Sequence, residues 1–304
     1  MSELPLPPAT RKLGTSDIEV SPIAWGMWRF ADNGHTASEA AKVVHAALDA
    51  GITFLDTADI YGFDGKAGFG NAETLLGEVL SAEPALRDRM VLATKGGILP
   101  PLPYDQSADY LRKAIDDSLR RLRVDHVDLW QIHRPDILAH PQEVARALDD
   151  ALASGKVRAL GVSNFTPAQI AALQHFLGNR LVTTQPEISP LRIACFENGE
   201  LDQAMMMGLT PLAWSPLGGG RLAAPEAPRD FAVAGALDMV AKAQGVSRTV
   251  ATYSWLMSHP AGIIPIIGSQ TPARIAEGVE ALKVRWTRQD WYAVLVAARG
   301  VPLP

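Results

Sequence analysis

Residues 53–61 read TFLDTADIY, a short apolar run that polar residues follow at once. The same order recurs in MVLATK at 90–95 and in VDLWQIH at 127–133. A short apolar run with polar neighbours is typical of a strand that is buried on both faces of a parallel sheet. Each expected strand then leads to reactive side chains, which are Asp56 and Tyr61 in the first stretch, Lys95 in the second and His133 in the third.

Eight apolar runs of this kind are spaced along the chain, and segments with apolar residues three and four apart lie between them. The expected strands are 22–26, 53–55, 90–93, 127–131, 157–161, 182–184, 210–213 and 263–266. The expected helices include 38–50, 72–81, 108–121, 141–154, 167–176 and 272–282. Several of these helices have favourable start signals, which are Ser38, Asn71 just ahead of 72–81, and a Pro at the first helical position.

Strands that alternate with helices form parallel βαβ units, and eight units favour closure into a (β/α)8 TIM barrel of the α/β class. An open doubly wound sheet is the alternative. Ahead of the first strand, LGTSDIEV at 13–20 alternates and turns like a β-hairpin. No linker divides the chain, so we expect one domain over residues 1–304, with residues 1–12 loosely held. The Gly- and Pro-rich segment 216–231 is expected to be a long loop over a ligand.

Composition excludes several classes of partner. Hydrophobic residues make up 47% of the chain, enough for a large core without metals or disulfides. The formal net charge is −5 and no stripe of Lys and Arg is present, so neither nucleic acid nor an anionic membrane is expected as a partner. Residues 1–20 lack a signal-peptide core, no apolar stretch is long enough for a membrane span, and Cys195 is the single cysteine. We therefore expect a cytoplasmic protein, monomeric by default, in which Cys195 is a small buried hydrophobe or a bystander rather than a nucleophile.

The loops that follow the strands of a parallel barrel gather on one face, so Asp56, Tyr61, Lys95 and His133 are expected to lie together there. A nearby ammonium such as that of Lys95 makes the phenolate of Tyr61 easier to form, and a buried ammonium needs a counter-charge such as Asp56. His133 can orient a carbonyl oxygen or help to move a proton. Each residue alone also has an ordinary structural explanation, as a turn residue, a rim aromatic, a solvated charge or a core histidine. The set of four favours a catalytic site.

The motifs DTADIYG, ATKGG, LWQIHRP, GKVRALGVSNF, TTQPEIS, AWSPLGGG and PIIGS occur in this order. In this combination the chain resembles the aldo-keto reductases from LGTSDIEV to its final helix, and particularly bacterial members with a Trp in the AWSPLGGG motif. The resemblance implies a barrel that binds NADPH/NADP and transfers hydride between it and the carbonyl of a small molecule. It also implies that Tyr61 is the general acid, that Lys95 and Asp56 tune it, and that His133 orients the substrate.

The resemblance further implies a site for an extended cofactor. Its residues are Met27 and Trp28, then Ser163, Asn164 and Gln185 at the nicotinamide carboxamide, Trp214 stacked on the nicotinamide ring, Ser215, Leu217 and Arg221 at the pyrophosphate, and Gly268, Ser269, Arg274 and Glu277 at the adenosine end. Gln270 stands where a Lys or Arg often adds charge, and Gly278 stands where an Asn often contacts adenine. NADP is favoured and NAD stays possible.

Some alternatives stay open. Trp214 can be a core residue, Asn164 can cap the helix near Pro167, and Gly218–Gly220 can be only a flexible loop. A redox-sensing barrel with little turnover would need the cofactor site alone, whereas a Schiff-base lyase would use Lys95, which Asp56 disfavours by keeping it charged. No GxGxxG follows a strand, and no HExxH, CxxC or acidic cluster predicts a metal site. Trp28, Phe30 and Phe63 can form an aromatic rim that does not decide among aldehydes, ketones and sugars.

Overall fold

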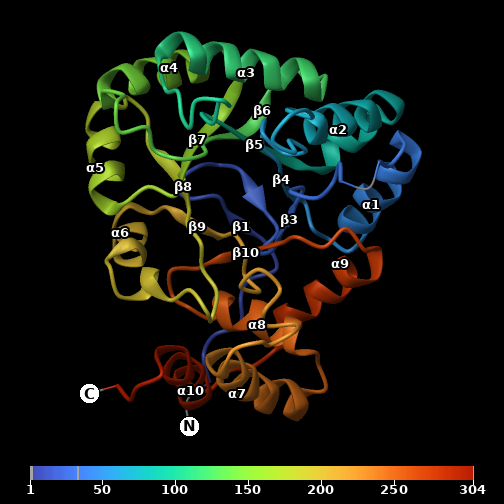
Figure 1. Ribbon diagram of the computed structural model, residues 1–304, viewed down its shortest axis with the longest axis vertical. Coiled ribbons are helices and arrows are strands. Elements are labelled where there is room, and N and C mark those ends of the chain that lie inside the picture. Colours follow the sequence, from blue (N-terminus) through green and yellow to red (C-terminus); the bar gives the residue numbers. More distant parts are fainter. Residues whose placement is uncertain (1–2, 33, 304) are drawn as a thin grey trace.

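A computed structural model describes residues 3–32 and 34–303 of the protein. Eight parallel strands form a closed barrel in the order β10-β3-β4-β5-β6-β7-β8-β9, and helices surround it (Figure 1). The predicted (β/α)8 barrel is confirmed. The alternative of an open sheet is wrong, because β10 pairs with β3 on one side and with β9 on the other.

All eight expected strands are present. They are β3 (Ala24–Gly26), β4 (Phe54–Asp56), β5 (Val91–Gly96), β6 (Val127–Ile132), β7 (Val157–Ser163), β8 (Leu181–Gln185), β9 (Thr210–Ala213) and β10 (Ile264–Ile267). Six of them continue past the expected end, and in four of these the extension places Asp56, Lys95, Ser163 and Gln185 inside the strand. The apolar pattern ends too early because polar side chains fill the end of the barrel and bond to one another there.

The six helices named from the sequence are present and differ from the observed ones mainly at their ends, and four further helices occur among the described residues. The helices that surround the barrel are α1 (Ala37–Asp49), α2 (Asn71–Ala82), α3 (Ala108–Leu122), α4 (Pro141–Ala153), α5 (Pro167–Phe176), α6 (Glu200–Met207), α7 (Pro228–Gln244), α8 (Arg248–Met257), α9 (Pro272–Gly278) and α10 (Arg288–Arg299). A capping box of Thr36 and Glu39 begins α1, rather than Ser38. The expected loop 216–231 is shorter, because Pro228 already begins α7.

Within the described residues, three short 3-10 helices complete the fold. They are η1 (Pro84–Arg89), η2 (Ala194–Phe196) and η3 (Val279–Lys283). The last of these takes over from α9, which ends at Gly278, so the expected helix 272–282 is divided in two. Among the residues that the structure describes, no helix is both long and apolar enough to cross a membrane.

The N-terminal hairpin closes one end of the barrel. Its strands β1 (Arg11–Lys12) and β2 (Glu19–Val20) are antiparallel, as predicted. Leu13 and Val20 are buried in one cluster with Phe54 and Leu129 of the barrel interior. Ahead of the hairpin, Leu4 N donates to the carbonyl of Trp286 at 2.7 Å. With apolar side chains at this end of the barrel, the polar side chains of the strands gather at the other.

Candidate active site

The register of the barrel strands aligns polar residues at the C-terminal ends of the strands. Gly26 of β3 pairs with Asp56 of β4, and Lys95 of β5 pairs with Gln131 of β6. Farther round the barrel, Ser163 of β7 pairs with Gln185 of β8. The structure therefore brings side chains from separate parts of the sequence into one polar layer at the mouth of the barrel.

Lys95 is the centre of this layer and is fully buried. Its Nζ donates to Asp56 Oδ2 at 2.6 Å, to the carbonyl of Thr57 at 2.8 Å and to the Tyr61 hydroxyl at 3.0 Å. These bonds use all three N–H donors of an ammonium group. Burial lowers the pKa of Lys95, but Asp56 and Tyr61 outweigh burial, so the pKa is raised above its usual value. Lys95 is therefore a cation at neutral pH, which disfavours the alternative of a Schiff-base lysine.

Tyr61 lies between Lys95 and two aromatic rings. Its ring meets Trp28 edge-on at 5.1 Å and His133 at 5.8 Å between ring centroids. Burial raises the pKa of Tyr61, and the lowering by Lys95 is smaller, so the net shift is upward. The expectation that Lys95 favours the phenolate describes one contribution and misses the larger one. At neutral pH the phenol keeps its proton and is able to donate it.

His133 supplies a neutral imidazole beside Tyr61. Burial, with the nearby charge of Lys95, holds the pKa of His133 well below its usual range. Its backbone N–H donates to the carbonyl of Gly96 at 2.8 Å, which fixes the residue at the end of β6. Within residues 3–32 and 34–303, the buried Nδ1 has no hydrogen-bond partner. An uncharged ring at this place suits a hydrogen bond to a neutral substrate.

The second oxygen of Asp56 is held by two glutamines. Oδ1 accepts from Gln185 Nε2 at 3.0 Å and from Gln131 Nε2 at 3.4 Å. Gln131 is not among the site residues predicted from the sequence, although a polar residue inside the apolar run VDLWQI is a signal of a buried polar site. Thr183 Oγ1 donates to Gln131 Oε1 at 3.1 Å, and Gly161 makes room for this contact because a Cβ there would overlap Thr183 Oγ1. The charge pair thus lies in a network of hydrogen-bonded side chains.

The residues expected at the nicotinamide carboxamide belong to the same network. Asn164 Nδ2 donates to the carbonyl of His133 at 3.1 Å and to Ser163 Oγ at 2.9 Å. Asn164 Oδ1 accepts from Trp214 Nε1 at 3.0 Å, so the half-buried indole is held at the end of β9. Asn164 has a φ of 62°, a strained value that is common at functional sites. Thr166, not Asn164, caps α5.

The residues expected at the pyrophosphate lie in the turns that follow β9. Ser215 has a φ of 53°, and its Oγ accepts from Gly219 N at 2.9 Å. Leu217 is half-buried. Arg221 is paired in a bidentate way with the buried carboxylate of Asp230, with Nε–Oδ2 at 3.0 Å and Nη2–Oδ1 at 2.5 Å. This hydrogen bonding lowers the pKa of Asp230 to about 2. Arg221 thereby fastens these turns to α7.

The residues expected at the adenosine end lie beyond β10, beside β3. Trp25 Nε1 donates to the carbonyl of Ser269 at 2.9 Å, and Gly268 is exposed just ahead of it. Arg274 and Glu277 are exposed on α9. In the part of the chain that the structure describes, the Arg274 guanidinium has no ion pair. Its donors are free for a ligand.

Two departures noted in the sequence have structural causes. Gln270 Nε2 donates to the carbonyl of Gly26 at 3.0 Å, which turns this side chain back toward β3. A Cβ at Gly278 would overlap Ile267 Cδ1, so α9 packs too closely on β10 for a side chain there. Two residues expected at the cofactor lie nearer the four catalytic candidates. Met27 is fully buried, with its N–H donating to the carbonyl of Asp56 at 2.9 Å, and Trp28 is 59% exposed beside Tyr61.

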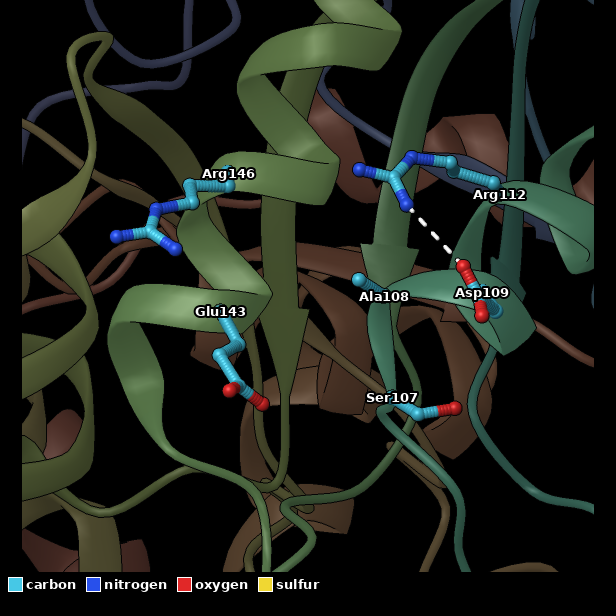
Figure 2. A pocket seen from close by; sticks show the side chains of 6 residues that line it. All are labelled: Ser107, Ala108, Asp109, Arg112, Glu143 and Arg146. Carbon is cyan, nitrogen blue, oxygen red and sulfur yellow. Dashed lines mark hydrogen bonds and ion pairs between the residues drawn. The ribbon is translucent and has the colours of Figure 1, made fainter.

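Two cavities among the described residues lie away from this site. A cavity of about 290 Å³ lies at the first turns of α3 and α4. Figure 2 shows side chains that line it, among them Asp109, Arg112, Glu143 and Arg146. A second cavity of about 260 Å³ lies beside α10. Neither includes any of the four catalytic candidates. Among the described residues, no group of three or more His, Cys, Asp and Glu could hold a metal ion.

Comparison with known proteins identifies the family of the chain. The model of the Aldo/keto reductase family matches residues 22–295. A 6-dehydroglucose reductase of Novosphingobium aromaticivorans is 82% identical over 304 residues, which cover all of both chains. A 6-dehydroglucose reductase of Agrobacterium fabrum is 40% identical and covers 95% of this chain and 98% of its own. The crystal structure of the thermostable aldo-keto reductase Tm1743 with the inhibitor epalrestat superposes with a TM-score of 0.81 at 20% identity, covering 95% of this chain and 99% of its own. By sequence match over nearly its whole length and by its closed barrel, the chain belongs to the aldo/keto reductase family.

Proposed function

We propose that this oxidoreductase uses NADPH to reduce the C6 aldehyde of 6-dehydroglucose to an alcohol, with Tyr61 as the general acid. The observation that carries the proposal is the chain of contacts from Asp56 through Lys95 to Tyr61, in which every ammonium donor is used. The raised pKa of Tyr61, which burial causes, keeps a proton on the phenol for delivery to a carbonyl oxygen.

Proton transfer follows from these contacts. NADPH, when bound, supplies a hydride to the carbonyl carbon. Negative charge then develops on the carbonyl oxygen, and the Tyr61 hydroxyl donates its proton to that oxygen. Lys95 stabilises the phenolate that remains, because its ammonium lies 3.0 Å from the Tyr61 oxygen, and Asp56 keeps Lys95 charged. A positioned general acid contributes about 10²–10⁴ in rate.

The remaining residues fit an NADP-type cofactor. Gln185 bonds to Asp56 through Nε2, which leaves its Oε1 to accept from a carboxamide N–H. Trp214 offers a half-buried aromatic face at the end of β9. The exposed Arg274 fits a 2′-phosphate, because a guanidinium binds phosphate through two parallel N–H bonds. Gln270 adds no charge there, so NADH stays possible as a weaker cofactor. Arg221 would meet the pyrophosphate through the donors that Asp230 does not use.

The substrate is proposed from the two relatives named 6-dehydroglucose reductase, one of which is 82% identical over the full length. The site suits a neutral sugar aldehyde in two ways. The neutral imidazole of His133 can donate to an oxygen next to Tyr61, and the exposed indole of Trp28 lies against the Tyr61 ring. An apolar face next to hydrogen-bonding groups is typical of small-molecule sites that fix orientation by a few polar contacts.

The test is NADPH oxidation by the purified protein with 6-dehydroglucose, with glucose measured as the product. Tyr61→Phe is expected to lower kcat by about 10²–10⁴ and to leave NADPH binding, read by quenching of tryptophan fluorescence, unchanged. Tyr104→Phe, in an exposed loop, is the matched control and keeps wild-type turnover. A Tyr61→Phe variant that keeps its rate, or loses cofactor binding instead, contradicts the assigned role. Tight NADPH binding without any turnover would favour the redox-sensing alternative.

A further inference from the structure

A second chain of contacts joins Tyr61 to Lys95 by way of α2. The carbonyl of Tyr61 accepts from Ala72 N at 3.1 Å, in the first turn of α2. The next residue, Glu73, accepts through Oε1 from Thr94 Oγ1 at 2.5 Å. Thr94 directly precedes Lys95 on β5, and Lys95 Nζ returns to the Tyr61 hydroxyl at 3.0 Å. The contacts therefore close a ring that includes both ends of the Tyr61 residue.

The Glu73 side chain has no exposed surface. Arg121 of α3 compensates its charge, with Nε donating to Glu73 Oε2 at 2.7 Å. A buried ion pair of this kind is weak evidence for stability, because desolvation opposes the Coulomb attraction. Fixing a geometry is a better-founded reason to keep it, and here the fixed geometry includes Tyr61.

Arg121 also supports the loop that carries Tyr61 into α2. A Cβ on Gly70, the N-cap residue just ahead of α2, would overlap Arg121 Cδ. The Arg121 guanidinium lies over the ring of Phe69, 5.8 Å from its centroid. Gly70 has a φ of 84°, which a residue with a side chain adopts only with strain. The loop after Tyr61 thus rests directly on Arg121, which Glu73 holds.

Tyr61 needs such support because it lies in a turn after β4, whereas Lys95 lies inside a barrel strand. Strand pairing fixes β5 but does not fix the backbone of Tyr61. We propose that Thr94 and Glu73 are positioning residues, whose hydrogen bond sets the distance between the Tyr61 hydroxyl and Lys95 without contact to substrate or cofactor. The inference rests on the proposed role of Tyr61 as the general acid.

Thr94→Val tests the bond directly, because it removes the hydroxyl, keeps the shape and leaves Glu73 paired with Arg121. Thr94→Ser retains the hydroxyl. The matched control is Thr252→Val, since Thr252 is equally buried and donates to the carbonyl of Arg248 at 2.8 Å in α8. Both valine variants are expected to lower Tm to a similar extent.

Only Thr94→Val is expected to lower kcat, by about 10- to 100-fold, because a small misplacement of a catalytic group has an effect of this size. KM and the Kd for NADPH are expected to stay unchanged, and Thr94→Ser is expected to recover most of kcat. A simple aromatic aldehyde is assayed beside 6-dehydroglucose, so that a wrong sugar substrate does not hide the effect.

A readout without turnover separates this inference from the proposed function. Titration of the tyrosines by ultraviolet absorbance, with Tyr61→Phe to identify the Tyr61 component, is expected to show a higher pKa for Tyr61 in Thr94→Val, because the ammonium is farther away. Thr252→Val should not shift it. If the wild type reduces no carbonyl, the proposed function fails and this shift alone decides the positioning role. An unshifted titration with wild-type kcat, or a Thr94→Ser variant as impaired as Thr94→Val, overturns the inference.

Discussion

Asp56→Asn removes the counter-charge of Lys95 and changes little else in shape. The ammonium would keep the Thr57 carbonyl and the Tyr61 hydroxyl as acceptors, but no carboxylate would lie within bonding distance. Breaking a buried pair in this way destabilises a fold by about 3–5 kcal/mol. Loss of the proton from Lys95 sets an upper limit, since moving from a pKa near 10.4 to pH 7 corresponds to about 4.6 kcal/mol at 1.36 kcal/mol per unit. Both estimates, for a charged and for a neutral Lys95, give a loss of unfolding free energy of about 3–5 kcal/mol.

The pH dependence of stability shows whether Lys95 of the variant is charged or neutral in the folded state. If Lys95 is neutral in folded Asp56→Asn, its folded pKa lies below the unfolded value, and the unfolded chain binds one more proton. Stability then rises with pH up to the unfolded pKa, so between pH 7 and pH 9 the deficit relative to wild type shrinks by about 2.7 kcal/mol. In the wild type the pKa of Lys95 is raised, since Asp56 and Tyr61 outweigh burial. The stability that the charged Lys95 contributes is therefore lost only above its unfolded pKa.

The assay is urea denaturation of both proteins at pH 7 and pH 9. Asp49→Asn is the matched control, because Asp49 makes an exposed ion pair with Arg89 at 2.7 Å. That pair is expected to contribute at most about 1 kcal/mol, with no change between the two pH values. A deficit of Asp56→Asn that is as small as that of Asp49→Asn and does not change with pH would refute the charge pairing at the centre of the site.

Three further predictions concern other residues. Burial holds the pKa of His133 well below its usual value, so the wild type should lose up to about 1.4 kcal/mol of stability per pH unit below pH 6.5. His133→Gln should reduce this slope in urea denaturation, and equal slopes for the two proteins would contradict the prediction. Gly278→Ala should destabilise the fold by about 1–3 kcal/mol, because the added Cβ overlaps Ile267. Gly235→Ala is the control, since Gly235 lies in α7 with nothing within 4 Å of an added Cβ, and it should stabilise the fold by up to about 1 kcal/mol. Equal Tm shifts of the two variants would argue against close packing of α9. Arg274→Ala should weaken NADPH binding about 10- to 100-fold by fluorescence titration, from the loss of a charged hydrogen bond, and should leave NADH binding unchanged; a parallel loss for NADH would refute the 2′-phosphate contact.

The barrel was predictable because each strand is an apolar run between polar residues, which is a local property of the sequence. The ends were less predictable, since Lys95 and Gln185 are polar yet lie inside strands. Helix α7 was missed because the pattern of its buried residues is interrupted by exposed apolar ones, Phe231 and Met239. Periodicity reports which residues can be buried, and tertiary packing decides which of them are.

The grouping of Asp56, Tyr61, Lys95 and His133 followed from a single rule, that loops after parallel strands share one face. This rule does not predict how burial and neighbouring charges together shift the pKa of each of these side chains. Burial outweighs Lys95 in the pKa of Tyr61, and burial depends on everything that packs around the ring. Side-chain contacts between residues that are distant in sequence could not be predicted either, such as that of Glu73 with Arg121, 48 positions apart.

The proposed function is tested most directly by following the hydride itself. The protein is incubated with 6-dehydroglucose and NADPH that carries deuterium at C4 of the nicotinamide, on the face that transfers hydride, and the product is analysed by mass spectrometry and NMR. The account predicts glucose with one deuterium at C6, formed by the wild type and greatly reduced with Tyr61→Phe. Unlabelled glucose, or no glucose despite bound cofactor, would contradict the assignment of this barrel as a reductase of that aldehyde.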